Sequence, residues 1–231
     1  LGGDVYQLIW SHHHALLDGW SLPLVFAEVV SFYQSLVDKK PIVPKPIHSY
    51  RSYISWLGEQ SFDDAREFWF KHLEGVESIT SLPLAQLRSK EAGIGKRSLR
   101  FSEEESRGLQ SLAHRAKTTM NVLVQGVWSL LLSRYSGDSQ VVFGATTSGR
   151  PPNLPGVEDM IGLFINTLPV VVNIDEQMSV QDWLYQLHED LIERESYNYM
   201  PLNEIQGLCS IKGSLFDSVV FFQNYPVDES L

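Results

Sequence analysis

Cysteine, long apolar runs and clustered basic residues are almost missing from this sequence. Cys209 is the only cysteine among 231 residues, so no disulfide can form within the chain. A single thiol is typical of a reducing compartment, and we expect a cytoplasmic protein. No run of eighteen apolar residues occurs, which predicts no membrane-spanning helix and no membrane partner. The net charge is −10 and no run of Lys or Arg stands out, which argues against nucleic acid as a partner.

Apolar periodicity and turn residues predict alternating helices and strands, which indicates the α/β class. Helices are expected at residues 22–40, 49–60, 61–75, 102–118, 119–137 and 179–199. Strands are expected at residues 5–10, 96–102, 139–150, 160–174 and 214–224. Ser21 and Ser61 are expected to cap helices, and Gly137 suits a helix C-terminus. Residues 41–49 read as a proline-rich connector and 77–95 as a loop.

Three consecutive histidines follow the first expected strand, in WSHHHALLDGWS (residues 10–21). One interpretation is purely structural. A second is a metal site, in which His12 and His14 share a strand face and Asp18 returns as a third ligand. The zinc spacing H-E-x-x-H is absent and no second Cys/His cluster exists, so we predict no metal.

The third interpretation is a general base. Histidine titrates near neutral pH and can take a proton from an attacking amine or hydroxyl. Such a base needs a fixed ring. Asp18 can fix the loop by an ion pair or by hydrogen bonds to backbone, and Gly19 permits a tight turn. No G-x-S-x-G nucleophile motif is present, so direct transfer without a covalent enzyme intermediate is the natural mechanism, with nearby donors stabilising the oxyanion.

Five segments together resemble one known family. HHALLDG (13–19) matches HHxxxDG, the signature of the condensation domains of nonribosomal peptide synthetases, which belong to the chloramphenicol acetyltransferase superfamily. YRSYISW, TTSGRP, IGLFINTLP and LFDSVVFFQNYP, which begin at residues 50, 146, 161 and 215, resemble further segments of that family. The segments stand in the family's order, so the resemblance covers essentially the whole chain.

The resemblance implies a fold and a reaction. The fold is a chloramphenicol acetyltransferase-like two-lobed α/β sandwich with a tunnel between the lobes. Upstream and downstream peptidyl carrier proteins insert phosphopantetheine arms from opposite mouths, and a neighbouring adenylation domain is a further partner. The domain itself binds no cofactor. The reaction is amide formation between a carrier-bound acyl or aminoacyl thioester and a carrier-bound aminoacyl acceptor.

Individual roles also follow from the resemblance. His14 is expected to be the catalytic histidine and His13 its structural partner, while Asp18 and Gly19 organise the loop. His12 lies outside the motif. Four more residues are expected along the substrate tunnel: Trp20, Ser148, Arg150 and Asn166.

The position of the motif predicts how much of the domain is present. Residues 1–45 would be the C-terminal part of the first lobe with the HHxxxDG motif, and residues 46–231 the second lobe, truncated at its end. Most of the first lobe would then lie outside this chain, together with the basic residue that pairs with Asp18. Such a fragment is expected to be inactive alone.

Departures from the family pattern leave the subclass open. The intact histidine pair argues against a heterocyclization domain, and DGWS (18–21) differs from the DGxSW order of epimerization domains. ESYNYMPLNEIQ (195–206) and SIKGSLFDS (210–218) match the family only loosely. Two other functions stay open: a non-catalytic lobe that docks carrier proteins, and a coenzyme A-dependent acyltransferase that uses the same histidine.

Overall fold

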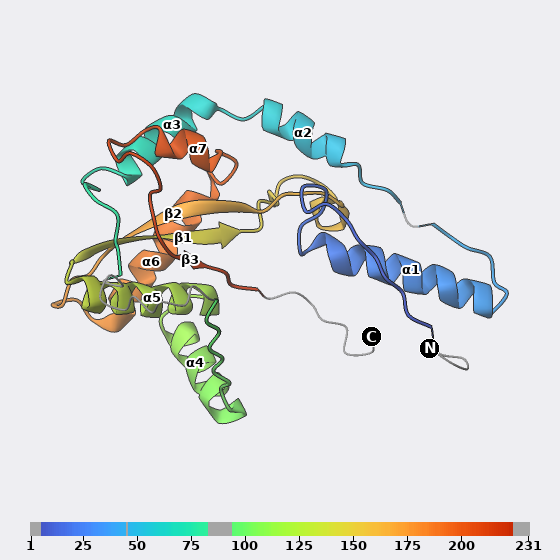
Figure 1. Cartoon of the computed structure of the whole chain (residues 1–231), viewed down its shortest axis with the longest axis horizontal. Coiled ribbons are helices and arrows are strands. Elements are labelled where there is room, and N and C mark those ends of the chain that lie inside the picture. Colours follow the sequence, from blue (N-terminus) through green and yellow to red (C-terminus); the bar gives the residue numbers. More distant parts are fainter. Residues whose placement is uncertain (1–5, 45, 83–93, 224–231) are drawn as a thin grey trace. The chain divides into compact units, whose positions relative to one another are not determined.

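The computed structural model describes residues 6–44, 46–82 and 94–223, which divide into two compact units. The first unit holds the described residues up to Gln60 together with Ser148–Ile165. The second holds the described residues of Ser61–Thr147 and of Asn166–Gln223. The first unit contains three helical segments: α1 (Ser21–Val37), α2 (Tyr50–Gly58) and the 3₁₀ turn η2 (Val157–Asp159) (Figure 1).

The second unit is built on a three-stranded sheet in the order β2-β1-β3. The strands are β1 (Gln140–Thr147), β2 (Asn166–Asn173) and β3 (Val219–Val220). β1 and β2 are antiparallel over eight residue pairs, from Gln140 opposite Asn173 to Thr147 opposite Asn166. β3 is parallel to β1 and pairs only at Gly144 and Ala145. A parallel neighbour on one side and an antiparallel neighbour on the other make the sheet mixed.

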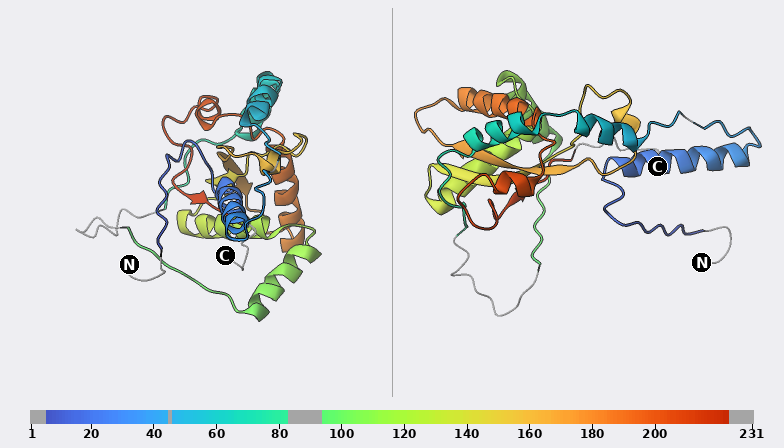
Figure 2. Two further views of the ribbon diagram at one scale, coloured as in Figure 1. Left: turned by 90° about the vertical axis from the view of Figure 1, so that its right-hand side faces the viewer. Right: turned by 90° about the horizontal axis from the view of Figure 1, so that it is seen from above.

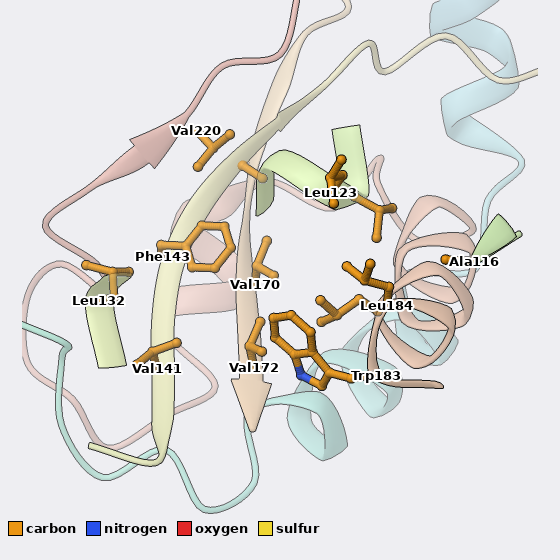
Figure 3. Close-up of a cluster of buried hydrophobic side chains, with 13 residues drawn as sticks. Ala116, Leu123, Leu132, Val141, Phe143, Val170, Val172, Trp183, Leu184 and Val220 are labelled. Carbon is orange, nitrogen blue, oxygen red and sulfur yellow. The ribbon is translucent and has the colours of Figure 1, made fainter. Parts of the chain in front are cut away.

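The described residues of the second unit also form five helices: α3 (Phe62–His72), α4 (Glu103–Arg115), α5 (Met120–Ser136), α6 (Val180–Glu195) and α7 (Leu202–Gln206). α5 packs on β1 and on α6 (Figure 2). In the main core, Phe143 and Val172 of the strands gather with Trp183 and Leu184 of α6 (Figure 3). Burial of such side chains contributes about 1.5–3 kcal/mol each. A second cluster joins α3 and α7 around the fully buried Trp69.

Local sequence signals explain where most helices begin and end. Ser61 caps α3 by accepting from the Asp64 N–H, and Ser102 forms a reciprocal capping box with Glu105 at the start of α4. Gly137 ends α5 with φ of 84°, a left-handed conformation that suits glycine. The six predicted helices are confirmed, with ends shifted by a few residues. The helix at 22–40 starts one residue earlier, because Ser21 is its first residue rather than its cap.

The strand predictions succeed only where a partner strand is present. Residues 139–150 and 160–174 contain β1 and β2, but 160–165 form a bend and irregular backbone. Of the described residues 214–223 only Val219–Val220 pair, and residue 224 lies outside the described residues. The predicted strand at 96–102 is wrong, and so is the part of 5–10 that the structure describes. Both segments have strand composition, yet no described strand pairs with them, and a lone strand leaves its backbone groups without ladder partners. Part of the loop predicted at 77–95 lies outside the described residues.

The lobe boundary predicted between residues 45 and 46 stays a prediction. The two compact units are groups of residues in mutual contact, and they do not define the lobes of the family fold. Among the described helices, none combines the length and the apolarity needed to cross a bilayer.

His72 is a buried histidine at the end of α3. Its side chain is 10% exposed and its ring is stacked on Phe68 with centroids 5.5 Å apart. Nδ1 lies 3.5 Å from Asp190 Oδ1, while the buried Nε2 has no hydrogen-bond partner within residues 6–44, 46–82 and 94–223. Burial lowers the pKa of His72 to about 4, against the opposing influence of Asp190 and with a smaller lowering by Arg194.

This buried ring should make the second unit sensitive to acid. Between pH 6.5 and about 4 the unfolded chain binds a proton that the folded His72 does not bind. As the pH falls through this window, the free energy of unfolding should therefore decrease, by up to roughly 3 kcal/mol from this group. Urea unfolding of the chain at stepped pH measures the slope. His72→Phe should flatten it, exposed His114→Gln should not, and an undiminished slope in His72→Phe would contradict the assignment.

Candidate functional site

The histidine motif lies on a short turn in the first unit. The Leu16 N–H donates to the His13 carbonyl at 3.0 Å, and the Ala15 N–H donates to His13 Nδ1 at 3.1 Å. Because Nδ1 is an acceptor here, a neutral His13 carries its proton on Nε2. The His13 ring thus closes the turn, and the next residue, His14, is exposed. The exposed imidazole of His14 can exchange protons with a bound reactant.

Asp18 anchors the end of the motif. Its side chain is 3% exposed. Oδ1 accepts from the Ser21 N–H at 2.9 Å and from the Ser21 hydroxyl at 2.8 Å, while Oδ2 accepts from the Phe164 N–H at 3.2 Å. The Asp18 N–H donates to the Gly162 carbonyl at 3.1 Å. Backbone and side chain of Asp18 therefore join the start of α1 to the segment 160–164.

Arg150 supplies the opposite charge. Its Nη2 lies 3.3 Å from Asp18 Oδ1, and its side chain is 5% exposed. Nη1 donates to the carbonyls of Val157 and Met160, and the guanidinium carbon lies 3.9 Å from the centre of the Phe164 ring. Burial lowers the pKa of Arg150, while Asp18 opposes that change. The prediction that the basic partner of Asp18 lies outside this chain is wrong, because Arg150 is that partner.

The two members of this pair are 132 residues apart in the sequence, and no local pattern connects their positions. Gly162 and Phe164 could not be predicted as partners of Asp18 for the same reason. One local signal was available: aspartate is common where a helix begins, since its side chain can accept from backbone N–H groups there, and Asp18 accepts from the Ser21 N–H.

An aromatic cluster supports the segment 160–164. The Tyr50 hydroxyl donates to the Leu163 carbonyl at 2.6 Å, and the Tyr50 ring meets Phe164 edge-on at 5.0 Å. A Cβ on Gly162 would stand 2.1 Å from the Tyr50 ring, so only glycine allows this approach. Tyr53 is also buried in the cluster, and burial raises its pKa to about 12. YRSYISW and IGLFINTLP thus meet in space through Tyr50 and Gly162.

Three other predicted site residues, Gly19, Trp20 and Ser148, also lie in the first unit. Trp20 is half-buried and its Nε1 donates to the Glu158 carbonyl at 3.0 Å, while Gly19 lies beside it in the same turn. Ser148 is exposed, and its hydroxyl accepts from the Arg150 N–H at 3.4 Å. These residues belong to the first unit. Their lining of a substrate tunnel stays a prediction, and for Arg150 the guanidinium is already occupied by Asp18.

Asn166 belongs to the second unit, at the start of β2. Its Nδ2 donates to the Asn198 carbonyl at 2.8 Å and to the Met200 carbonyl at 2.9 Å, and its Oδ1 accepts from the Thr167 N–H at 2.8 Å. Both amide protons are therefore used within the protein. In this arrangement Asn166 holds the backbone around Asn198 and Met200, and has no donor left for a substrate oxygen.

The metal interpretation of the histidine cluster finds no geometry to support it. The Asp18 carboxylate is buried on Ser21, Phe164 and Arg150, so it does not join the exposed histidines. The His12 ring contacts Trp10 instead, with centroids 5.0 Å apart. Within the described part of the chain, no group of three His, Cys, Asp or Glu side chains could hold a metal ion.

Comparison with known protein families identifies the family of this chain. A model of the family described as "Condensation domain" matches residues 3–231. The chain belongs to the condensation-domain family. Its resemblance to condensation domains of nonribosomal peptide synthetases, inferred above from the motifs, is therefore confirmed.

The relatives of this condensation domain are large synthetases. One of the linear gramicidin synthase proteins of Brevibacillus parabrevis is 43% identical over 236 residues, which cover 100% of this chain and 3% of the relative. Bacitracin synthase 3 of Bacillus licheniformis is 39% identical over 226 residues, covering 97% of this chain and 4% of the relative. The chain thus spans only a few hundredths of the length of these synthetases.

Solved structures establish the fold. The first condensation domain of the calcium-dependent antibiotic synthetase superposes with a TM-score of 0.70 at 17% identity, over 90% of this chain and 48% of that one. A four-domain nonribosomal peptide synthetase, holo-AB3403, gives a TM-score of 0.71 at 23% identity, over 93% of this chain and 17% of that one. The predicted α/β condensation-domain fold is confirmed, and this chain covers about half of a condensation domain.

We expect removal of the Arg150 charge to destabilise the first unit strongly. Arg150→Met leaves the buried Asp18 carboxylate without its counter-ion, which should cost about 3–5 kcal/mol of unfolding free energy. Equilibrium urea unfolding measures the change. Lys40→Met is the matched control, because Lys40 pairs with Asp38 at 3.0 Å on the surface, where such pairs contribute about 1 kcal/mol or less. Equal losses in the two variants would refute the importance of the buried pair.

Proposed function

We propose that this chain is part of a condensation domain of a nonribosomal peptide synthetase, which joins a carrier-bound acyl or aminoacyl thioester to a carrier-bound aminoacyl amine. The observation that carries the proposal is the exposed imidazole of His14 on a turn whose far end is anchored by the buried Asp18. A base that is accessible and still held in place is what proton transfer from an amine requires.

The chemistry assigned to His14 is simple. The amine nitrogen of the acceptor attacks the thioester carbonyl carbon of the donor. The new C–N bond forms, the C–S bond breaks, and the pantetheine sulfur leaves. His14 takes the proton that the amine loses and returns it to the departing sulfur. His13 accepts the Ala15 N–H and so holds the turn that presents His14, which supports its role as structural partner.

The relatives support the setting of this reaction. The relatives named linear gramicidin synthase and bacitracin synthase match over nearly the whole of this chain. We infer that the substrates arrive on phosphopantetheine arms of upstream and downstream carrier proteins, with an adenylation domain nearby. The domain needs no cofactor of its own in this scheme.

In a complete condensation domain that contains this chain, His14→Ala should reduce peptide-bond formation by about 100-fold or more, since a positioned general base contributes about 10²–10⁴-fold. The assay follows transfer between two loaded carrier proteins by mass spectrometry of the acceptor carrier. His12→Ala is the matched control, because His12 is a neighbouring histidine whose ring contacts Trp10, and it should retain activity. Full activity of His14→Ala would reject His14 as the catalytic base.

The same assay separates the alternatives. If only acyl-coenzyme A serves as donor, the chain comes from a coenzyme A-dependent acyltransferase. If carrier proteins bind and neither donor reacts in the unmodified domain, it is a docking lobe.

The 231-residue chain alone should give no measurable condensation. It spans 48% of the solved domain it superposes on, so we expect the surfaces that orient both substrate arms to be incomplete. The measurement uses the same loaded carriers, with the complete domain as positive control. Product above the enzyme-free background would overturn this expectation.

A further inference from the structure

Ser21 occupies an unusual position for the first residue of a helix. The helix cap is Trp20, which makes no side-chain capping bond, and Ser21 itself is 0% exposed. Its hydroxyl points inward. Four polar atoms surround this oxygen: Asp18 Oδ1 at 2.8 Å, the Gly162 carbonyl at 3.0 Å, the Gly162 N–H at 3.1 Å and Arg150 Nη2 at 3.3 Å.

These neighbours use the full capacity of one hydroxyl. A serine hydroxyl has one proton to donate and two lone pairs that accept. Gly162 N–H and Arg150 Nη2 can fill both lone pairs, and the proton goes to the Asp18 carboxylate or to the Gly162 carbonyl. Within the described residues the Gly162 N–H has no other acceptor. Alanine, glycine or a larger apolar residue would leave that buried donor unsatisfied.

The Ser21 hydroxyl also decides where the Asp18 backbone lies. The Gly162 carbonyl accepts from the Asp18 N–H, and the Gly162 N–H donates to the Ser21 hydroxyl, so Asp18 and Ser21 both bind the backbone of Gly162. A Cβ on Gly162 would stand 2.1 Å from the Tyr50 ring, so this ring packs closely against the glycine. His14 lies only four residues before Asp18 in the chain. A displacement of Asp18 would therefore be transmitted through this short segment to His14.

We infer that Ser21 is a positioning residue for His14: its buried hydroxyl locks Asp18 and Gly162 together and so sets where the His14 imidazole stands. The catalytic part of this inference rests on the proposed function. Ser21 does not itself reach a substrate, because it is fully buried. It acts through Asp18.

The test compares Ser21→Ala with Ser35→Ala. Ser35 lies on the same helix and is half-buried, and among the described residues its hydroxyl donates to the Ser31 carbonyl one turn back. Two readouts are measured. The first is the position of the His14 ring signal in NMR spectra of the ¹³C-histidine-labelled 231-residue chain, assigned with His14→Gln. The second is condensation by the complete domain, with kcat and the KM for each carrier protein determined separately, well below the unfolding temperature.

Ser21→Ala should shift or broaden the His14 signal and lower kcat roughly 10- to 100-fold with the carrier KM values unchanged, since a small misplacement of a reacting group costs this much. Ser35→Ala should change neither. A merely structural role for Ser21 would lower the unfolding temperature while kcat and the His14 signal stay as they are, and that result overturns the inference. If Ser21→Ala does not fold, Ser21→Cys replaces it, because a thiol has similar shape and is a weak hydrogen-bonding group.

The two readouts separate this inference from the proposed function. If His14→Ala keeps full activity while Ser21→Ala still moves the His14 signal, the catalytic assignment fails and the positioning by Ser21 stands. If His14→Ala is inactive while Ser21→Ala changes neither the signal nor kcat, the positioning inference fails and the catalytic assignment stands.

Discussion

The buried pair of Asp18 and Arg150 is the interaction on which the first unit depends. Each charge alone would lose several kcal/mol on leaving water, so neither is tolerable without the other. Their 3.3 Å approach is completed by hydrogen bonds to Ser21, Phe164 and Met160, which occupy most of the remaining donors and acceptors. The buried Arg150 Nε is left without a partner among the described residues, so the arrangement keeps a residual polar cost.

The pair has a consequence for chemistry because of where it lies in the sequence. Asp18 is four residues after His14, and Arg150 comes from a segment more than a hundred residues away. The exposed histidine therefore stands on a turn whose end is tied to a distant part of the chain. An accessible side chain on a loose loop would sample many positions, whereas anchoring the loop limits that freedom before any substrate binds. Buried polar groups can in this way limit the positions of an exposed side chain.

The second unit is held by other means. Its sheet and helices α5 and α6 enclose an apolar core, which is stabilised by close packing of its described side chains and not by a buried ion pair. A Cβ on Gly144 would stand 2.6 Å from the Phe216 ring, and one on Gly126 would stand 3.0 Å from Leu184. Where β1 ends and β2 begins, the interactions are polar. Glu195 accepts there from Thr147 and Asn198 at 2.8 and 2.7 Å. Asn166 lies in this polar region, and both of its amide protons are donated to backbone carbonyls.

Sequence by itself determined six of the helices, the Ser61 cap, the two long strands and the family, but not the short helix α7 or the cap of α1. The features that it determined depend on near neighbours: a serine cap with an acid three residues on, Gly137 after an apolar helix, and HHALLDG as a contiguous motif. Only the tertiary structure decided that residues 6–10 and 96–102 are not strands, since a strand exists through its partner and composition does not name one. It also decided that Arg150 pairs with Asp18, that Ser21 turns inward, and that Asn166 donates to backbone. These are contacts between residues far apart in the chain, and burial, which gives them their strength, arises only when the chain has folded.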